Sequence, residues 1–173
     1  MVQRTSAPQA EGVWRSVVAA FPRPKRLTAD DRASLEQLMA PLGLRWRIQN
    51  IIRAVETLAR APNQDVRSIA GVGPYITASI EMIAQRRRTP VIDSNVVRVY
   101  SRFLGTEAND GTRRNRAFRI MSAAMLPRSR TRDYNWAILD LGATVCTPRA
   151  PKCAGCPLEP RCASRAKSTE NPN

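Results

Sequence analysis

Apolar residues along most of this chain recur with the spacing of a helix. Residues 45–61 are the clearest case, because their apolar side chains share one helical face and their arginines lie on the other. The apolar set there is Ile48, Ile51, Ile52, Val55, Leu58 and Ala59. No segment alternates with the period of two that a half-buried strand requires. The sequence therefore predicts an all-α protein.

Shorter segments follow the same rule and are separated by proline, glycine and polar breaks. We expect helices over 13–21, 28–40, 93–104, 114–126 and 133–145. The segment 63–88 predicts two short helices around a tight glycine turn. Thr28, followed three residues later by Asp31, has the spacing of a capping box and predicts the start of the second helix. Residues 1–12 and 166–173 are expected to be disordered.

Charge is the feature of the composition that says most about partners. The chain has 28 Lys and Arg residues against 14 Asp and Glu, a formal net charge of +14, and Arg far outnumbers Lys. A guanidinium group binds phosphate through two parallel hydrogen bonds, which favours a polyanion as partner. A basic surface kept for solubility is the alternative. The basic residues are spread through the folded region, which favours nucleic acid.

Nothing in the sequence predicts a membrane or secreted protein. No apolar run has membrane-spanning length, and the first residues lack the apolar centre of a secretion signal. We therefore expect a protein of the cytoplasm, associated with the bacterial nucleoid. We also expect it to be a monomer. Thiols stay reduced in the cytoplasm, so a disulfide framework is not expected.

All four cysteines lie in one short segment near the C-terminal end. Cys146, Cys153, Cys156 and Cys162 have the spacing Cys-x6-Cys-x2-Cys-x5-Cys, and prolines stiffen the loop between them. Four thiolates can hold a tetrahedral zinc ion or a [4Fe–4S] cube. Structural zinc commonly uses two separated Cys-x2-Cys pairs, whereas this chain has one such pair and no histidine. The spacing favours the cluster and leaves zinc as the alternative.

The stretch IAGVGPYITASI, residues 69–80, predicts a sharp turn into a helix. Gly71 and Gly73, on either side of Val72, permit a tight turn and a close approach of a ligand to the backbone. Pro74 occupies the first helical position, where its missing N–H matters least. Amides at such a helix N-terminus can bind a phosphate oxygen. A plain connection between two helices is the alternative.

Asp93 begins a helix after the apolar residues of TPVIDSNVVRVY. Asp, Ser and Asn are ordinary capping residues, so a cap is one interpretation. Negative charge is stabilised at a helix N-terminus, and an ionised carboxylate there can also stabilise a developing positive charge. The two roles are compatible.

These segments together, with PLGLRWRIQNI at 41–51, resemble the helix–hairpin–helix (HhH-GPD) DNA glycosylase superfamily. Its members include endonuclease III and the adenine and thymine mismatch glycosylases. The resemblance implies a two-lobed fold: a helical barrel lobe over 13–90, with the hairpin at about 64–85, and a lobe over 91–165 with a [4Fe–4S] loop at 146–162. It implies a DNA cleft between the lobes, in which Tyr75 and Asp93 face each other.

The resemblance also assigns roles to individual residues. Asp93 matches the catalytic aspartate, and the DNA partner is a duplex with a mismatched or damaged base that is flipped out before base excision. The residues implied to bind DNA are Gly71, Val72, Gly73 and Tyr75 in the hairpin and Arg149, Lys152 and Arg161 in the cysteine loop.

Tyr75 stands where the endonuclease III type has a lysine that attacks the sugar. A phenol cannot form a Schiff base, so the resemblance implies a monofunctional glycosylase. Tyrosine there is similar to the thymine mismatch enzymes, which implies thymine or uracil opposite guanine as substrate. A tyrosine that only packs, and an adenine glycosylase acting opposite oxidised guanine, are the alternatives. Because the family has a helical segment upstream of the point where Met1 falls, a non-catalytic DNA-binding module is a further alternative.

Overall fold

The computed structural model describes residues 7–23, 25–43 and 45–165, and the described part contains helices and no strand. The all-α prediction is therefore confirmed. The tail predicted to be disordered, 166–173, and the first six residues lie outside the described residues.

The chain divides into two compact units, 1–73 and 74–173. The division falls earlier than the expected lobe boundary at residue 90. The reason is the helix α4 (Pro74–Ile83), which packs on α7 (Thr131–Thr144) of the second unit. Met82 of α4, Val91 and Leu139 of α7 share one small core.

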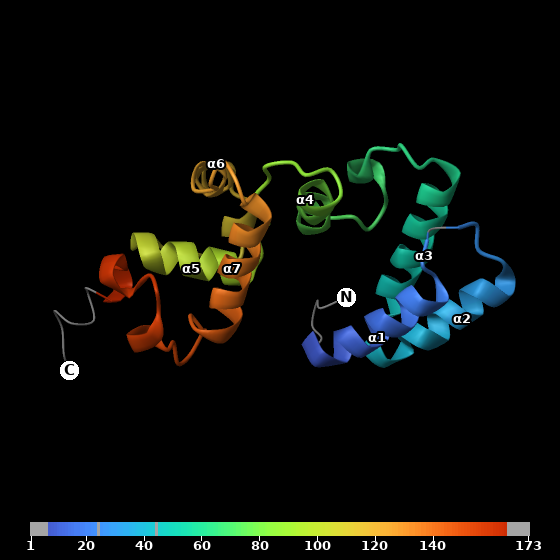
Figure 1. Ribbon diagram of the computed structural model, residues 1–173, viewed down its shortest axis with the longest axis horizontal. Helices are drawn as coiled ribbons and strands as arrows, with labels where there is room; N and C mark the ends of the chain where they lie inside the picture. The colour runs from blue at the N-terminus through green and yellow to red at the C-terminus, as the bar shows by residue number, and fades with distance from the viewer. Residues whose placement is uncertain (1–6, 24, 44, 166–173) are drawn as a thin grey trace. The chain divides into compact units, whose positions relative to one another are not determined.

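The described helices of the first unit lie against one another (Figure 1) and share one core. They are α1 (Ala7–Ala20), α2 (Ala29–Met39) and α3 (Arg45–Arg60), with short 3₁₀ turns η1 (Ala40–Leu42) and η2 (Val66–Ser68). The capping box predicted at Thr28 is present, since the Thr28 hydroxyl accepts from the Asp31 amide and the Asp31 carboxylate accepts from the Thr28 amide. The core residues are Ala10, Val13, Leu35, Met39, Leu42, Ile48 and Ile52.

Two details of this unit differ from the sequence prediction. The helix α1 begins at Ala7, so the second half of the stretch expected to be disordered is helical, and Ala10 is part of the core. On α3, Ile48 and Ile52 are buried as expected, but Arg47 is buried as well. A long side chain packs its methylene groups against apolar neighbours, which a two-sided pattern does not reveal.

The second unit packs α5 (Ser94–Leu104) across α7 (Figure 1). The helix α6 (Arg116–Ala124) and the 3₁₀ turn η3 (Thr112–Arg114) complete one side, and η4 (Cys153–Gly155) and η5 (Glu159–Arg161) carry the cysteine loop. Val96, Val99 and Tyr100 of α5 and Ile138 of α7 form the centre of the core.

Asn135 of α7 fixes the segment that leads into α5. Its buried side chain accepts a hydrogen bond from the Val91 amide (2.9 Å) and donates to the carbonyl oxygen of Thr89 (3.1 Å). Buried polar groups in such a connection need partners, and Asn135 supplies them on both sides of Pro90. The chain therefore enters α5 in one defined position. None of the described helices is long and apolar enough to cross a membrane.

Candidate functional site

Asp93 caps α5, as one of its two interpretations predicted. Its Oδ1 accepts a hydrogen bond from the Val96 amide at 2.8 Å, and its Oδ2 accepts from Nδ2 of Asn95 at 3.0 Å. The side chain is half-buried. Both carboxylate oxygens are thus held in place, and each keeps a second lone pair.

Arg98 extends this arrangement toward the cysteine loop. Its Nη2 donates to Oδ1 of Asn95 at 2.8 Å and to the Gly142 carbonyl oxygen at 2.6 Å. Its Nε donates to the carbonyl oxygen of Cys146 at 2.8 Å. Because Asn95 accepts from Arg98 through its oxygen, its amide nitrogen is turned to Asp93. The hydrogen bonds therefore run without a gap from Cys146 to Asp93.

Gly142 allows the two helices to approach closely enough for this. A Cβ atom at Gly142 would lie 2.7 Å from the Cβ of Asn95, which is too close for two carbon atoms. Only glycine fits this position on α7 without moving α5. The close packing of Gly142 against Asn95 therefore links the approach of the two helices to the position of the Asn95 side chain.

Tyr75, in the first turn of α4, lies near Asp93 within the same unit. Burial raises the pKa of the Tyr75 phenol, and the negative charge of Asp93 raises it further. The phenol therefore stays protonated at neutral pH. About a third of the residue (36%) is exposed, so it is accessible from solvent.

The hairpin turn preceding α4 uses its two glycines differently. Gly71 has φ +84°, and a Cβ there would lie 2.7 Å from Cβ of Asn50, so glycine is required by the fold. A Cβ at Gly73 would meet nothing within 4 Å. The Val72 amide donates to the Ile69 carbonyl oxygen at 3.0 Å, so it is already used inside the turn. The space beside Gly73 is open to a ligand.

The four cysteines surround a single cavity of about 270 Å³. They are free and partly exposed. Within 7–23, 25–43 and 45–165, no three Cys, His, Asp or Glu side chains are gathered closely enough to hold one metal ion. A cubane cluster differs from one ion, because its four irons lie at separate corners and its ligands reach it from around its surface. The donor set around this cavity fits such a group.

Arg102 of α5 contacts both ends of the cysteine loop. Its Nη1 donates to the Thr147 carbonyl oxygen (2.7 Å) and to Sγ of Cys146 (3.5 Å). Its backbone carbonyl oxygen accepts from Sγ of Cys162, also at 3.5 Å. The first and last cysteines of the loop are thereby held to one residue. The loop's basic side chains, Arg149, Lys152 and Arg161, are all exposed.

The sequence singled out Asp93, Tyr75 and the cysteines, and the structure brings Tyr75 near Asp93 and the four cysteines around one cavity. The sequence did not indicate roles for Asn95, Arg98 and Arg102. Asn95 and Arg98 were visible in the segment that indicated Asp93, at spacings of two and five residues. Nothing in the sequence alone indicated that their partners would come from α7 and the cysteine loop.

The fold and the site define a class of base excision repair protein. The chain matches the HhH-GPD superfamily base excision DNA repair protein over residues 1–122. It therefore belongs to the HhH-GPD superfamily, as its motifs indicated. The match includes the hairpin and Asp93 and ends before Cys146.

Individual relatives carry two different substrate names. The chain is 30% identical to the adenine DNA glycosylase of Mycobacterium tuberculosis over 167 residues, 92% of this chain and 55% of that protein. It is 25% identical to the thymine/uracil-DNA glycosylase of Pyrobaculum aerophilum, over 91% of this chain and 74% of that protein. The chain thus spans about half the length of the adenine glycosylase it matches.

Solved structures agree with the fold. A thermostable thymine-DNA glycosylase superposes with a TM-score of 0.82, 20% identity and coverage of 96% of this chain and 80% of that one. An endonuclease III trapped covalently on DNA superposes with a TM-score of 0.73, again at 20% identity, over 97% of this chain and 81% of that one.

Proposed function

We propose that this protein is a monofunctional DNA glycosylase that hydrolyses the N-glycosidic bond of thymine or uracil opposite guanine. The observation that carries the proposal is the Asp93 carboxylate, held by Val96 and Asn95 beside the protonated Tyr75 phenol. We expect it to act on chromosomal DNA in the cytoplasm, in base excision repair.

In this mechanism the target base is first flipped out of the duplex. As the base leaves, positive charge develops on the sugar, and the negative charge of Asp93 stabilises it or orients the attacking water. Asn95, fixed by Arg98, keeps the carboxylate oriented while the charge develops. A pre-positioned charge avoids the reorganisation that water would need.

Tyr75 supports the monofunctional assignment. Its phenol is protonated at neutral pH and offers no amine, so no Schiff base with the sugar forms at this position. The tyrosine also favours thymine or uracil over adenine, through the family resemblance of this hairpin position. Adenine opposite oxidised guanine is the second candidate, since relatives named adenine glycosylases are up to 30% identical.

DNA binding is proposed for the hairpin and the cysteine loop. The open space at Gly73 and the first-turn amides of α4 suit a phosphate oxygen. Arg149, Lys152 and Arg161 are exposed, consistent with phosphate contacts. Gly71 serves the turn itself. The Val72 amide is engaged, so we assign Val72 no phosphate contact through its N–H.

The cofactor proposed for Cys146, Cys153, Cys156 and Cys162 is a [4Fe–4S] cluster. Bound there, it would hold the loop as a structural staple, because the segment is too short to build a core of its own. Arg102 and Arg98 would then transmit the position of the loop to α5.

The function is tested with Asp93→Asn on duplexes with G·T, G·U or adenine opposite 8-oxoguanine. The parent should release T or U, and Asp93→Asn should reduce the single-turnover rate by at least about 100-fold, as expected for loss of a pre-positioned charge. Duplex affinity should be unchanged or higher, since a negative charge is removed. Asp30→Asn, in the exposed first turn of α2, is the matched control and should release base like the parent.

Three other results would each support a different interpretation of the protein. Release of adenine alone would keep the glycosylase and reverse the substrate. Full activity in Asp93→Asn would leave Asp93 as a cap only. Binding without base release from every duplex would favour the non-catalytic module.

A further inference from the structure

The segment 89–93 lies along α4 and runs in the opposite direction to it. Thr89 is tied to the C-terminal half of the helix, because its hydroxyl donates to Oε2 of Glu81 at 3.3 Å. Asp93, at the other end of the segment, lies near Tyr75 in the first helical turn, where burial raises the pKa of the phenol and the Asp93 charge raises it further. The register of the segment on α4 therefore determines which helical residue Asp93 meets.

Val91, midway along this segment, is packed between α4 and α7. It is almost fully buried (1% exposed) and shares a core with Ala78 and Met82 of α4 and with Leu139 of α7. Alternate residues of the segment thus face α4, which is the period of an extended chain. Packing of apolar side chains is non-directional, so it does not by itself fix the segment along the helix.

The side chain of Asn135 supplies directional contacts that fix this register. It is 4% exposed. Its Oδ1 accepts from the Val91 amide at 2.9 Å, and its Nδ2 donates to the Thr89 carbonyl oxygen at 3.1 Å. Nδ2 also lies 3.2 Å from Sδ of Met82, which shares a face of α4 with Tyr75. One buried amide thus contacts both the segment and the helix face on which Tyr75 lies.

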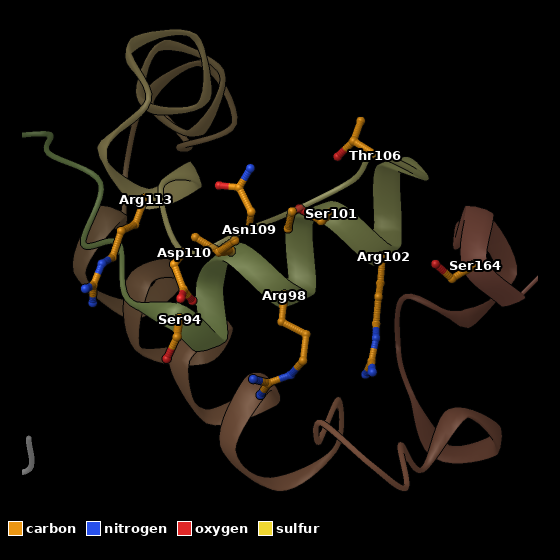
Figure 2. A pocket seen from close by; sticks show the side chains of 11 residues that line it. Ser94, Arg98, Ser101, Arg102, Thr106, Asn109, Asp110, Arg113 and Ser164 are labelled. Carbon is orange, nitrogen blue, oxygen red and sulfur yellow. The ribbon is translucent and has the colours of Figure 1, made fainter. Parts of the chain in front are cut away.

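The residues after Asp93 are held by the same helix, α7. Ser94 opens α5, and Arg98, one turn further, extends from α5 toward α7 (Figure 2). Its Nη2 donates to the Gly142 carbonyl oxygen at 2.6 Å. Asn135 and Gly142 are both buried on α7, at a spacing that places them on one helix face. The chain is therefore held to α7 on both sides of Asp93, and Asn135 makes the contact on the side of α4.

We propose that Asn135 is a positioning residue of the base-excision site, which places the Asp93 carboxylate beside Tyr75 by fixing the register of residues 89–91 on α4. The inference rests on the proposed function, in which Asp93 stabilises the charge that develops on the sugar. Such stabilisation depends on where the carboxylate lies, and a displacement of about 1 Å can reduce a rate about 100-fold. Asn135 is buried, so it acts through Asp93 and not on the substrate.

The test compares two substitutions of Asn135 with a matched change in the segment itself. Asn135→Leu keeps the size of the side chain and removes its hydrogen bonds. Asn135→Ser leaves polar space in which a water can bridge the Val91 amide and the Thr89 carbonyl group, so it should fold even if Asn135→Leu does not. Thr89→Val keeps the carbonyl group that Asn135 binds and removes only the hydroxyl bond to Glu81.

Phe118→Ala is the control for a loss of stability. The Phe118 ring lies on α6, and its centroid is 6.3 Å from that of Tyr100 in the second half of α5. Its truncation should destabilise the second unit through a contact that does not involve the segment 89–93. Thermal unfolding ranks the stability of the variants. Base release from a G·U duplex is then measured in single turnover, at a temperature at which every variant tested is folded.

Base release by Asn135→Leu and Asn135→Ser should fall about tenfold to 100-fold, with duplex affinity close to that of the parent. Thr89→Val should lose less, because the hydrogen bonds of Asn135 remain. Phe118→Ala should release base like the parent. If the base-release rate instead follows the thermal midpoint across these variants, Asn135 acts through stability alone and the proposal is overturned.

A second measurement does not depend on catalysis. Burial and the charge of Asp93 both raise the pKa of Tyr75, so displacement of Asp93 should lower this pKa. Ultraviolet titration against Tyr75→Phe should show the decrease in Asn135→Ser, and no further decrease when Asp93→Asn is already present.

An unchanged pKa of Tyr75 in Asn135→Ser, or an equal decrease with and without Asp93→Asn, would overturn the positioning role. Absence of base release by the parent would instead count against the proposed function, and the titration would still decide whether Asn135 places Asp93 beside Tyr75.

Discussion

Arg98 donates from Nε to the backbone carbonyl oxygen of Cys146 at 2.8 Å, so the first cysteine of the loop is tied to the helix that begins after Asp93. The same guanidinium holds Asn95, and Asn95 holds the Asp93 carboxylate. A continuous set of hydrogen bonds therefore connects the cysteine loop to the candidate catalytic carboxylate.

Arg98→Lys tests this connection. Lysine keeps the charge but loses the planar fork that reaches three acceptors at once. The free energy of unfolding should fall by about 2 kcal/mol, as expected when hydrogen bonds of a charged donor are lost. The base-release rate should fall as well, with duplex affinity nearly unchanged. Urea denaturation and single-turnover assays measure the two effects. Arg119→Lys should change the unfolding free energy by less than about 0.5 kcal/mol, as surface substitutions do.

Alanine substitutions at the two hairpin glycines should distinguish a role in the fold from a role in DNA binding. Gly71→Ala places a side chain at φ +84° and against Asn50, so it should destabilise by about 2–4 kcal/mol. Gly73→Ala meets no protein atom, so its stability should match the parent. Its duplex affinity should nevertheless fall, because the new methyl group occupies the space proposed for a phosphate. Equal duplex affinity in Gly73→Ala and the parent would remove this residue from the DNA interface.

The cluster proposal predicts a brown protein with about four iron atoms per chain. Cys153→Ser should lose iron, visible absorbance and stability together, because one corner of the cluster loses its ligand. Ala154→Ser, at the next and exposed position of the same loop, adds a hydroxyl without removing a thiol and should stay brown. Colourless parent protein carrying stoichiometric zinc would contradict the assignment.

The pKa of Tyr75 offers a test of its position that does not depend on catalysis. Burial and the charge of Asp93 both raise it. Because the pKa of Tyr75 is raised in the folded state, its protonated phenol contributes to the free energy of unfolding at pH values below the unfolded-state pKa near 10. This contribution is lost as the pH rises through the folded-state pKa. Asp93→Asn removes one of these two causes, so it should lower the pKa of Tyr75. Burial remains, so the pKa should stay above its usual value. Ultraviolet titration against Tyr75→Phe isolates this residue, and an unchanged pKa in Asp93→Asn would place the two residues apart.

The parts of the fold that depend on local sequence could be predicted. The capping box at Thr28, the turn at Gly71 and the apolar face of α3 need only neighbouring residues, and each is present. The unit boundary at Gly73 could not be predicted, because it depends on Met82 packing with Leu139, far apart in the chain.

The candidate site divides in the same way. Asp93 and the cysteines are recognisable from their local motifs. Arg98 lies in such a motif too, yet its role depends on carbonyl groups of Gly142 and Cys146, which any residue could supply. Backbone acceptors leave no trace in a sequence. Asn135 is an ordinary helical residue in the sequence until the fold buries it.

Tyr75→Lys is the sharpest test of the reaction type. It places an amine where a phenol lies close to Asp93. Partial burial should lower the pKa of this amine and favour the neutral nucleophile, while the Asp93 charge opposes that shift, so the reaction should be slow. The parent should leave an intact abasic strand, cut only by later alkali. The variant should cut the strand itself, and borohydride should trap it covalently on DNA through the Schiff base.

Ile76→Lys is the matched control, since it adds the same amine to the next residue of α4, which is 44% exposed. Successive helical residues point about 100° apart, so an amine at residue 76 should not reach a sugar that faces residue 75. Trapping of Tyr75→Lys alone therefore places residue 75 against the sugar. If a Tyr75→Lys variant that still binds DNA is not trapped, residue 75 faces elsewhere. Cutting and trapping by the parent would show that another amine of the chain acts, and the monofunctional assignment would then be wrong.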